Sequence, residues 1–288
     1  IMPSLVGSEM CIRDRFKNLI SIITAEENIR LAYRNLKKNA GSRTPGTDGK
    51  TIADLAKMSE PELIGFVQQK FNWYQPQSVR RKEIPKGNGK TRPLGIPTIM
   101  DRLIQQCVLQ VMEPICEAKF CETSNGFRPN RGVENALAQA EKHMQKSNLH
   151  IVIDIDIKGF FDNVNHGKLL RQIWAMGIHD KKLLSIISAM LKAEVAGIGF
   201  PEKGTPQGGI LSPLLSNIVL NELDWWITSQ WVGMPTRHEY SGKIHENGTK
   251  DQSKKYRELR KTNLKECYIV RYADDFKIFC RKHSDAVK

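Results

Sequence analysis

Two adjacent carboxylates, Asp274 and Asp275, lie between two short runs of β-forming residues. Tyr268–Val270 precedes them and Phe276–Phe279 follows. Two strands separated by so few residues predict a β-hairpin with both aspartates at its tip. Two carboxylates held together repel each other unless a cation lies between them. Asp is also a common turn residue, so an ordinary polar turn explains the same pair.

A second strand with carboxylates is predicted far earlier in the chain, at Ile151–Ile157. The two-residue period of a strand places its four isoleucines on one face and Val152, Asp154 and Asp156 on the other. Acidic residues are depleted from strands, so two on one face need a partner. A Lys or Arg side chain would meet that need, and so would a metal ion. If this strand shares a sheet with the hairpin, the three carboxylates suit two Mg²⁺ ions about 4 Å apart, the clamp used in phosphoryl transfer.

The charge balance favours a polyanionic partner. Lys and Arg number 44 against 31 Asp and Glu, a formal net charge of +13. Nucleic acid is the default partner for such a chain, although a solvated basic surface gives the same count. With 40% hydrophobic residues, the 288-residue chain can bury a core in one large domain or two.

Cysteine usage and hydropathy indicate a cytoplasmic protein. The six cysteines form no CxxC pair, so we interpret them as reduced thiols. No apolar run approaches the roughly 18 residues of a membrane span.

A basic segment at 78–92 holds six basic side chains and one acidic one. Asn88-Gly89 within it is a strong hairpin-turn signal. With Lys86 and Arg92 on its arms, this hairpin would hold phosphates. A solvated edge hairpin, protected by its charge against aggregation, is the alternative interpretation.

Apolar residues at helical spacing predict a series of helices between these segments. The first follows the capping-box spacing of Thr24 and Glu27 and ends near Gly41. A helix over 101–120 contains Pro114, which we expect to kink it or end it. Further helices are expected at about 59–73, 133–146, 181–192 and 212–226, and one begins after the N-cap Asn165.

Two local patterns carry more specific expectations. In the loop at 204–209, three glycines would let the backbone approach a ligand closely, because glycine has no side chain. The inward face expected for the helix over 133–146 consists of Ala136, Leu137, Ala140 and Met144.

Five blocks of the sequence resemble the motifs of one family, in the family's order. The tetrad Tyr272–Asp275 resembles the YxDD box of reverse transcriptases, and Asp156–Asp162 resembles their first carboxylate motif. The other three blocks are Ile84–Lys86 with Arg92 and Pro93–Thr98, then Asn125–Pro129, and then Thr205–Leu215. The blocks lie between residues 84 and 275, and the resemblance, which covers about residues 24 to 280, is greatest to bacterial group II intron-encoded reverse transcriptases.

The resemblance implies an α+β fold, a right-hand polymerase with fingers and palm, in which an antiparallel palm sheet packs on helices and the thumb is absent. We expect residues 16–77 to form an N-terminal extension and the start of the fingers, and 78–147 the fingers. Residues 148–288 would form a palm that is incomplete at its C-terminus, with a basic insertion at about 233–266. Residues 1–15 resemble a translated sequencing adapter and are excluded from fold reasoning.

The resemblance also assigns site residues by matching motif. Asp156, Asp274 and Asp275 are the expected catalytic carboxylates, and they bind two Mg²⁺ ions together with the backbone carbonyl of Ile157. The expected nucleotide-binding residues are Lys86, Arg92, Phe161 and Gln207. The expected nucleic-acid-binding residues are Arg80, Arg81, Arg128 and Arg131.

Two of these assignments have plain structural alternatives. Phe161 matches the bulky residue beneath the incoming sugar, which would exclude a 2′-hydroxyl and select deoxynucleotides. A core aromatic is the alternative there. Gln207 matches a residue that contacts the incoming nucleotide, and a loop-stabilising amide is the alternative.

The implied function is RNA-directed DNA polymerisation, with transfer of nucleotides from dNTPs to a primer 3′-hydroxyl. Intron RNA would be the template, DNA the primer or target, and the protein would also assist splicing and mobility of the intron. The alternatives are a non-intron bacterial reverse transcriptase, of the retron, diversity-generating or defence-associated type, and an RNA-binding maturase without polymerase activity. We also expect this chain to be a gene fragment with weak or no activity of its own.

Overall fold

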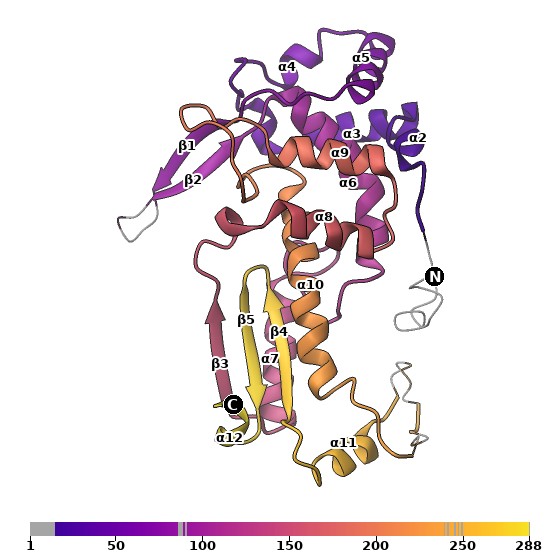
Figure 1. Cartoon of the computed structure of the whole chain (residues 1–288), viewed down its shortest axis with the longest axis vertical. Coiled ribbons are helices and arrows are strands. Elements are labelled where there is room, and N and C mark those ends of the chain that lie inside the picture. Colours follow the sequence, from indigo (N-terminus) through magenta and orange to yellow (C-terminus); the bar gives the residue numbers. More distant parts are fainter. Residues whose placement is uncertain are drawn as a thin grey trace. The chain divides into compact units, whose positions relative to one another are not determined.

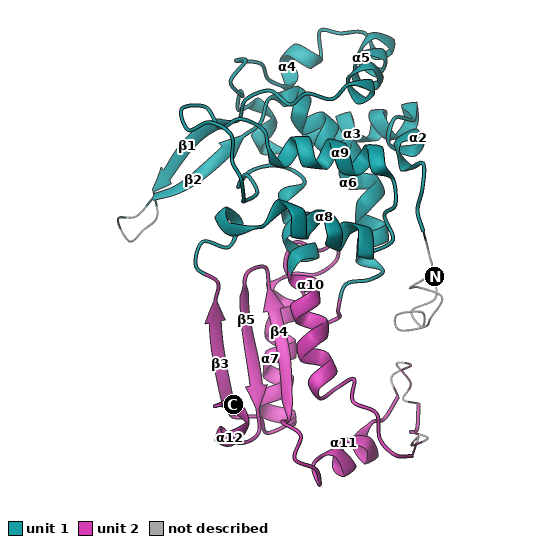
Figure 2. Ribbon diagram, in the orientation of Figure 1, with its two compact units in different colours: residues 1–120, 158–219 teal, residues 121–157, 220–288 magenta. Residues whose placement is uncertain are grey.

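The computed structural model describes residues 15–85, 89, 91–238, 240, 242–244, 246, 248 and 250–287. The chain divides into two compact units, each formed by segments that are distant in sequence (Figure 2). Unit 1 comprises residues 1–120 and 158–219, and unit 2 comprises residues 121–157 and 220–288. These units are defined by packing, whereas the fingers and palm expected above were defined by motifs.

Unit 1 is mostly helical (Figure 1). Its longest complete helix, α6, packs against α2 and α3 and buries Leu103, Ile104 and Val108 in the core. The helices of this unit are α2 (Leu19–Ile23), α3 (Glu26–Lys38), α4 (Ile52–Leu55), α5 (Glu60–Asn72), α6 (Ile99–Glu117), α8 (His166–Ala175), α9 (Lys181–Leu191) and the start of α10 (Ser212–Gln230). Short 3-10 turns lie at Ala40–Arg43 and Phe161–Asn163.

The basic segment forms the predicted hairpin. Strand β1 (Arg80–Pro85) pairs antiparallel with β2 (Thr91–Ile96), so that Ile84 lies opposite Arg92. Lys86 and Asn88, at the expected turn, lie outside the described residues. The hairpin is therefore confirmed as far as its two strands.

Of two helix starts in unit 1 that were predicted from capping residues, one is confirmed and one is wrong. Asn165 caps α8 by accepting a hydrogen bond from the backbone N–H of Lys168 (2.8 Å), as predicted. The Thr24 capping box is wrong, because the Thr24 hydroxyl instead donates to the carbonyl of Ile20 (2.8 Å) at the end of α2. Pro114 lies inside α6, which continues to Glu117.

Unit 2 contains an antiparallel sheet of three strands in the order β3-β5-β4 (Figure 1). The strands are β3 (Ile151–Asp156), β4 (Cys267–Tyr272) and β5 (Asp275–Cys280). The other elements are α7 (Val133–Glu141), a π-helical turn (Lys142–Lys146), the remainder of α10, α11 (Ser253–Leu259) and α12 (His283–Ala286).

Each face of this sheet has its own apolar cluster. On one face, Phe276 and Ile269 pack with Ile227 and Leu223 of α10, and Ile155 and Ile157 pack against them. On the other face, Val270 and Phe279 pack with Leu149 and with Ala136 and Ala140 of α7. The isoleucines of β3 lie on one face of the strand, as predicted, and are half-buried. Val152, Asp154 and Asp156 on the other face of this strand are exposed.

Two expectations in unit 2 are wrong. Leu137 and Met144 are 63% and 39% exposed, because α7 turns only its small residues Ala136 and Ala140 toward the sheet and then widens into the π-helical turn. Helix α10 does not end at Trp225-Trp226 but continues to Gln230. The segment 233–266, which we expected to be a basic insertion, contains the helix α11.

The five cysteines of the described segments are free thiols, whereas Cys11 lies outside those segments. In the part of the chain that the structure describes, no helix is long and apolar enough to cross a membrane.

Candidate active site

The sheet of unit 2 brings two of the predicted carboxylates, Asp156 and Asp275, to one end of the face that also carries Val270 and Phe279. In the antiparallel register of β3 and β5, Asp156 lies directly opposite Asp275. Directly opposite residues have Cβ atoms about 5 Å apart, and like charges in such a pair destabilise a sheet. Tyr272 of β4 lies opposite Asp275 on its other side. The pair of aspartates is exposed, so solvent or a cation can reach it.

Asp274 belongs to the two-residue connection between β4 and β5. The other residue of this turn, Ala273, has a φ of 57°, in the left-handed region that non-glycine residues seldom adopt. Asp274 is half-buried beside the exposed Asp275. The predicted hairpin with two aspartates at its tip is confirmed.

Asp154 lies on the same face of β3 as Asp156 but has a cation of its own. It lies opposite Lys277 of β5, whose ammonium group is 2.6 Å from the Asp154 carboxylate. The same ammonium is 3.7 Å from Asp275. The hydrogen bond to Asp154 raises the pKa of Lys277. Of the two acids on this strand, Asp154 therefore has a local neutralising partner.

A buried ion pair lies directly beneath the turn. Arg271 and Asp224 of α10 are both fully buried, and the guanidinium donates from Nε (2.8 Å) and Nη2 (2.6 Å) to the Asp224 carboxylate. Burial raises the pKa of Asp224, and the hydrogen bonds and charge of Arg271 oppose that rise. The guanidinium also donates to the carbonyl of Ala273 (2.7 Å) and to the Ser124 hydroxyl (2.6 Å).

The Asn125–Pro129 block gains a structural explanation from this arrangement. The backbone N–H of Arg271 donates to the carbonyl of Thr123 and its carbonyl accepts from the N–H of Asn125, both at 2.9 Å. A Cβ atom on Gly126 would overlap the backbone nitrogen of Ala273. This segment therefore forms a backbone wall against the tetrad, which requires glycine at 126.

Three of the residues predicted to bind the nucleotide, Arg92, Phe161 and Gln207, lie in unit 1. The N–H of Gly95 in β2, the strand that carries Arg92, donates to the carbonyl of Gln207 (2.6 Å). The N–H of Thr205 in the same loop donates to the carbonyl of Phe161 (2.7 Å). Arg92 is exposed, whereas Phe161 and Gln207 are half-buried. One loop therefore connects the basic hairpin to Phe161, which follows Asp156 by five positions in the chain.

The carboxylates on β3 and on the β4–β5 hairpin fit either a polar turn or a metal site, and the family of the chain distinguishes between these two interpretations. The family model described as reverse transcriptase (RNA-dependent DNA polymerase) matches residues 84–288, and all five described blocks fall within or at the edge of that span. The chain belongs to the reverse transcriptase family. The predicted α+β fold, with small antiparallel sheets and helices, is confirmed with it. Enzymes of this family copy a nucleic-acid template from a primer and use divalent metal ions.

Two relatives are similar to this reverse transcriptase over most of the chain. Protein YkfC of Escherichia coli K12 is 34% identical over 272 residues, which cover 91% of the chain and 70% of that protein. The group II intron-encoded protein LtrA of Lactococcus lactis subsp. cremoris is 39% identical over 232 residues, covering 77% of the chain but 37% of that protein. The chain thus spans little more than a third of the length of LtrA.

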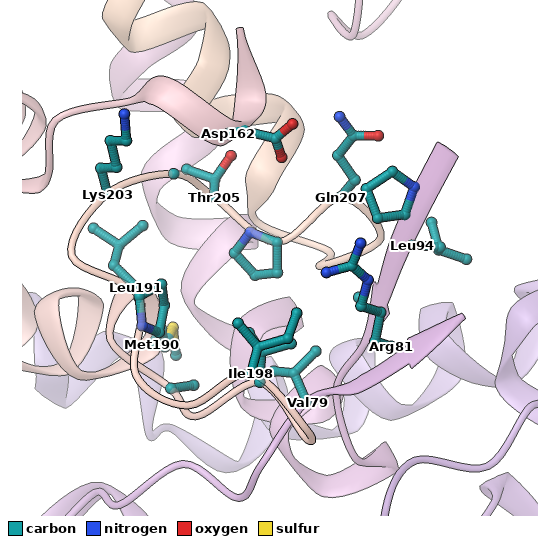
Figure 3. A pocket seen from close by; sticks show the side chains of 17 residues that line it. Val79, Arg81, Leu94, Asp162, Met190, Leu191, Ile198, Lys203, Thr205 and Gln207 are labelled. Carbon is teal, nitrogen blue, oxygen red and sulfur yellow. The ribbon is translucent and has the colours of Figure 1, made fainter. Parts of the chain in front are cut away.

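A pocket of about 220 Å³ in unit 1 of this reverse transcriptase borders the Gln207 loop. Figure 3 shows the polar side chains of Asp162, Thr205 and Gln207 on one side and the apolar side chains of Val79 and Ile198 on the other. The Thr205 hydroxyl is buried and has no hydrogen-bond partner among the described residues. At residues 204–207 the loop therefore borders a cavity and is not fully packed against the core.

Two glycines of this loop lie close to neighbouring backbone, which gives a structural reason for glycine at these positions. Gly204 (φ 94°) would place a Cβ 3.0 Å from the carbonyl oxygen of Phe161. Gly208 (φ 113°) would place one 2.7 Å from the carbonyl oxygen of Gly95. Both glycines therefore let the loop pack closely against the 3-10 turn and β2.

The four arginines proposed to bind nucleic acid differ in their surroundings. Arg128 is 8% exposed and donates to the carbonyls of Cys121 and Ser124, which favours a structural role for it. Arg131 donates to the carbonyl of Glu122 (2.7 Å) from a more open position. In the hairpin, Arg80 is half-buried and Arg81 is exposed and paired with Glu83.

The carboxylates fit a divalent cation by their chemistry and register. Within the described residues, no three His, Cys, Asp or Glu side chains are already grouped closely enough to hold a metal ion. The backbone nevertheless sets Asp156 opposite Asp275 beside Asp274, and carboxylate oxygens are the ligands that Mg²⁺ prefers.

Two residues that support the site, Asp224 and Gln105, could not be predicted from the sequence. Asp224 lies within an apolar helical stripe, where the only signal was a single acid on the buried face. Gln105 of α6 is buried, and its side-chain oxygen accepts from the N–H of Ile210 (2.8 Å), just after the Gln207 loop. Each acts through a contact with a residue distant in sequence, which local patterns do not reveal.

Proposed function

We propose that this chain is the catalytic core of a group II intron-encoded protein that synthesises DNA on an intron RNA template. The observation that carries the proposal is the register that sets Asp156 opposite Asp275 with Asp274 in the adjoining turn. In this proposal residues 78–147 belong to the fingers and residues 148–288 to the palm. The free thiols of the described cysteines support a cytoplasmic location.

The three carboxylates, with the carbonyl of Ile157, are the proposed ligands of two Mg²⁺ ions. Such ions supply a lowered pKa at the primer 3′-hydroxyl and charge neutralisation at the triphosphate. Asp156 and Asp275 supply ligands from two paired strands, so their spacing is fixed by the sheet rather than by a loop. Asp274 supplies a third from the two-residue turn between β4 and β5.

The nucleotide would be held by residues of unit 1. Arg92, together with Lys86, is the proposed ligand of the triphosphate, and its exposed position on β2 supports this role. Gln207 is the proposed contact of the incoming nucleotide, supported by its backbone bond to β2. Phe161 is proposed to exclude the 2′-hydroxyl of a ribonucleotide, and its T-shaped packing against the buried Phe160 supports a restricted ring position.

Template and primer would follow the basic surface. The net charge of +13 favours a nucleic-acid backbone, and Arg80, Arg81 and Arg131 are the proposed contacts among the arginines considered. Intron RNA as template and DNA as primer or target are proposed because LtrA carries the name of a group II intron-encoded protein. Assistance to intron splicing is proposed on the same ground.

The test is primer extension on an RNA template by the full-length protein, with dNTPs and Mg²⁺. Asp274→Ala is expected to abolish extension while RNA binding is retained, because the change removes a metal ligand and leaves the basic surface intact. Extension at the wild-type rate by this variant would refute the site. No extension by the wild-type protein, with RNA bound normally, would instead identify an RNA-binding maturase without polymerase activity.

A further inference from the structure

Arg271 uses its whole guanidinium group in contacts around the Tyr272–Asp275 tetrad. One edge of the group, Nε and Nη2, binds Asp224 of α10. The remaining donors reach the hydroxyl of Ser124 and the carbonyl of Ala273. The side chain is fully buried, so water does not replace any of these partners.

The bond to the Ala273 carbonyl fixes the orientation of a particular peptide plane. That carbonyl belongs to the same rigid amide as the backbone nitrogen of Asp274, so holding its oxygen also holds the start of the Asp274 backbone. Ala273 has a φ of 57°, a conformation that an alanine adopts only when its surroundings require it. The turn therefore depends on partners outside itself.

The opposite side of the turn is limited by the Thr123–Gly126 segment. Its backbone pairs with Arg271, and Gly126 lies so close that a Cβ atom would come 3.0 Å from both the Ala273 Cα and the Tyr272 carbonyl carbon, and closer still to the Ala273 nitrogen. The turn is thus held from beneath by a guanidinium and from the side by a backbone wall. Both supports belong to unit 2, as does the turn.

We propose that Arg271, oriented by Asp224, is a positioning residue that sets the Asp274 and Asp275 carboxylates for metal binding, with Gly126 as the second support. This inference rests on the proposed function, because it takes those carboxylates as metal ligands. Arg271 touches neither metal nor substrate in this scheme. It acts by fixing the peptide that precedes Asp274.

The first test is Arg271→Lys, measured as Mn²⁺ binding to the chain by calorimetry or electron paramagnetic resonance. Lysine keeps a positive charge for Asp224 but has one nitrogen and no planar fork, so it cannot serve Asp224, Ser124 and Ala273 together. We expect the affinity for Mn²⁺ to fall about tenfold, the loss typical when a residue that orients metal ligands is changed. Fe²⁺-directed cleavage of the backbone near the turn should weaken in parallel.

Arg281→Lys is the matched control. Arg281 follows β5 in the same unit and donates to the Glu266 carboxylate (2.6 Å) and to the Ser147 carbonyl (2.9 Å), at the end of the sheet away from the turn. A merely structural role for Arg271 predicts that both variants lower the thermal midpoint and that neither changes the Mn²⁺ affinity of the folded protein. That result would overturn the inference.

Gly126→Ala tests the second support of the turn. It also tests the positioning of the Asp274 and Asp275 carboxylates if Arg271→Lys does not fold. Its Cβ would displace the Ala273 backbone while leaving the Arg271–Asp224 pair in place, so Mn²⁺ affinity should again fall. Gly65→Ala is its control, because a Cβ there would have no atom within 4 Å. Wild-type Mn²⁺ affinity in folded Gly126→Ala would contradict the proposed role of the wall and, where Arg271→Lys is unfolded, the whole inference.

Asp274→Ala separates this inference from the function on which it rests. If Asp274→Ala binds Mn²⁺ as the wild type does, the assignment of the metal ligands itself is wrong. If Asp274→Ala loses binding and folded Arg271→Lys keeps it, the ligands are correct and only the positioning role fails.

Discussion

Asp156 and Asp275 lie directly opposite each other on β3 and β5, although more than a hundred residues separate them in the chain. An antiparallel ladder fixes this pairing, because a slip of one residue would turn the isoleucine face of β3 outward. The register that buries the core of unit 2 therefore also sets the spacing of the candidate metal ligands. Formation of the β3–β5 pairing in this unit therefore also brings Asp156 and Asp275 together.

Removal of Asp224 should destabilise the protein strongly. Asp224→Ala leaves Arg271 buried without its counter-charge, and breaking such a buried pair from one side costs about 3–5 kcal/mol. The free energy of unfolding in urea measures this change. Glu258→Ala, which breaks an exposed pair with Lys261 in the same unit, is expected to cost at most about 1 kcal/mol. Equal losses in the two variants would contradict the account of the buried pair.

The stability of unit 2 should depend on pH through Glu266. Burial raises the pKa of this carboxyl, but Arg260 and Arg281 outweigh that effect and lower it to about 2. A pKa that is lower in the folded protein contributes stability that is fully present above the unfolded value of 4.5 and is lost as pH falls toward 2. The wild type should therefore lose more unfolding free energy than Glu266→Gln between pH 4.5 and 2.

Urea unfolding of both proteins at several pH values in this window measures that difference. Glu266→Gln should be the less stable protein at pH 7, and the gap should narrow as the pH falls. Glu258→Gln, at an exposed position, serves as the control. A gap that stays constant from pH 7 to 2 would show that Glu266 does not titrate as described.

Phe161→Ala should relax the discrimination against ribonucleotides. Loss of the ring would open space where the 2′-hydroxyl is proposed to clash, so use of rNTPs relative to dNTPs should rise by about 10- to 100-fold. The measurement is the ratio of kcat/KM for the two nucleotides in primer extension by the full-length protein. Phe200→Ala, at a 77% exposed position, is the control and should keep the wild-type ratio. An unchanged ratio in Phe161→Ala would support the plain core role.

Much of the fold follows from patterns that are local in sequence. The alternation in Ile151–Ile157 correctly predicted which residues of β3 share a face, and the short interval between Val270 and Phe276 correctly predicted the hairpin. Caps such as Asn165 were also predictable, because the side chain binds a backbone N–H only three residues away. In each case the deciding contact lies within a few residues.

The predictions for Thr24 and Leu137 were wrong because each residue had more than one possible contact. The sequence does not show which of these contacts is the more favourable. The Thr24 hydroxyl had two helices within reach and bound the carbonyl at the end of the earlier one. Leu137 fits an apolar stripe, yet the smaller Ala136 and Ala140 allow the closer approach of α7 to the sheet. The contact between Arg271 and Asp224 could not be predicted either, because it joins a strand to a helix that precedes it by more than forty residues.

The most direct test of the account compares Asp156→Ala with Asp154→Ala in RNA-templated primer extension by the full-length protein. The two acids lie two residues apart on one face of β3, but Asp156 faces Asp275 whereas Asp154 is paired with Lys277. We predict that Asp156→Ala loses about a thousandfold or more in rate, as expected for a lost metal ligand, and that Asp154→Ala stays close to the wild type. Substantial extension by Asp156→Ala, or an equal loss in both variants, would contradict the assignment of the site.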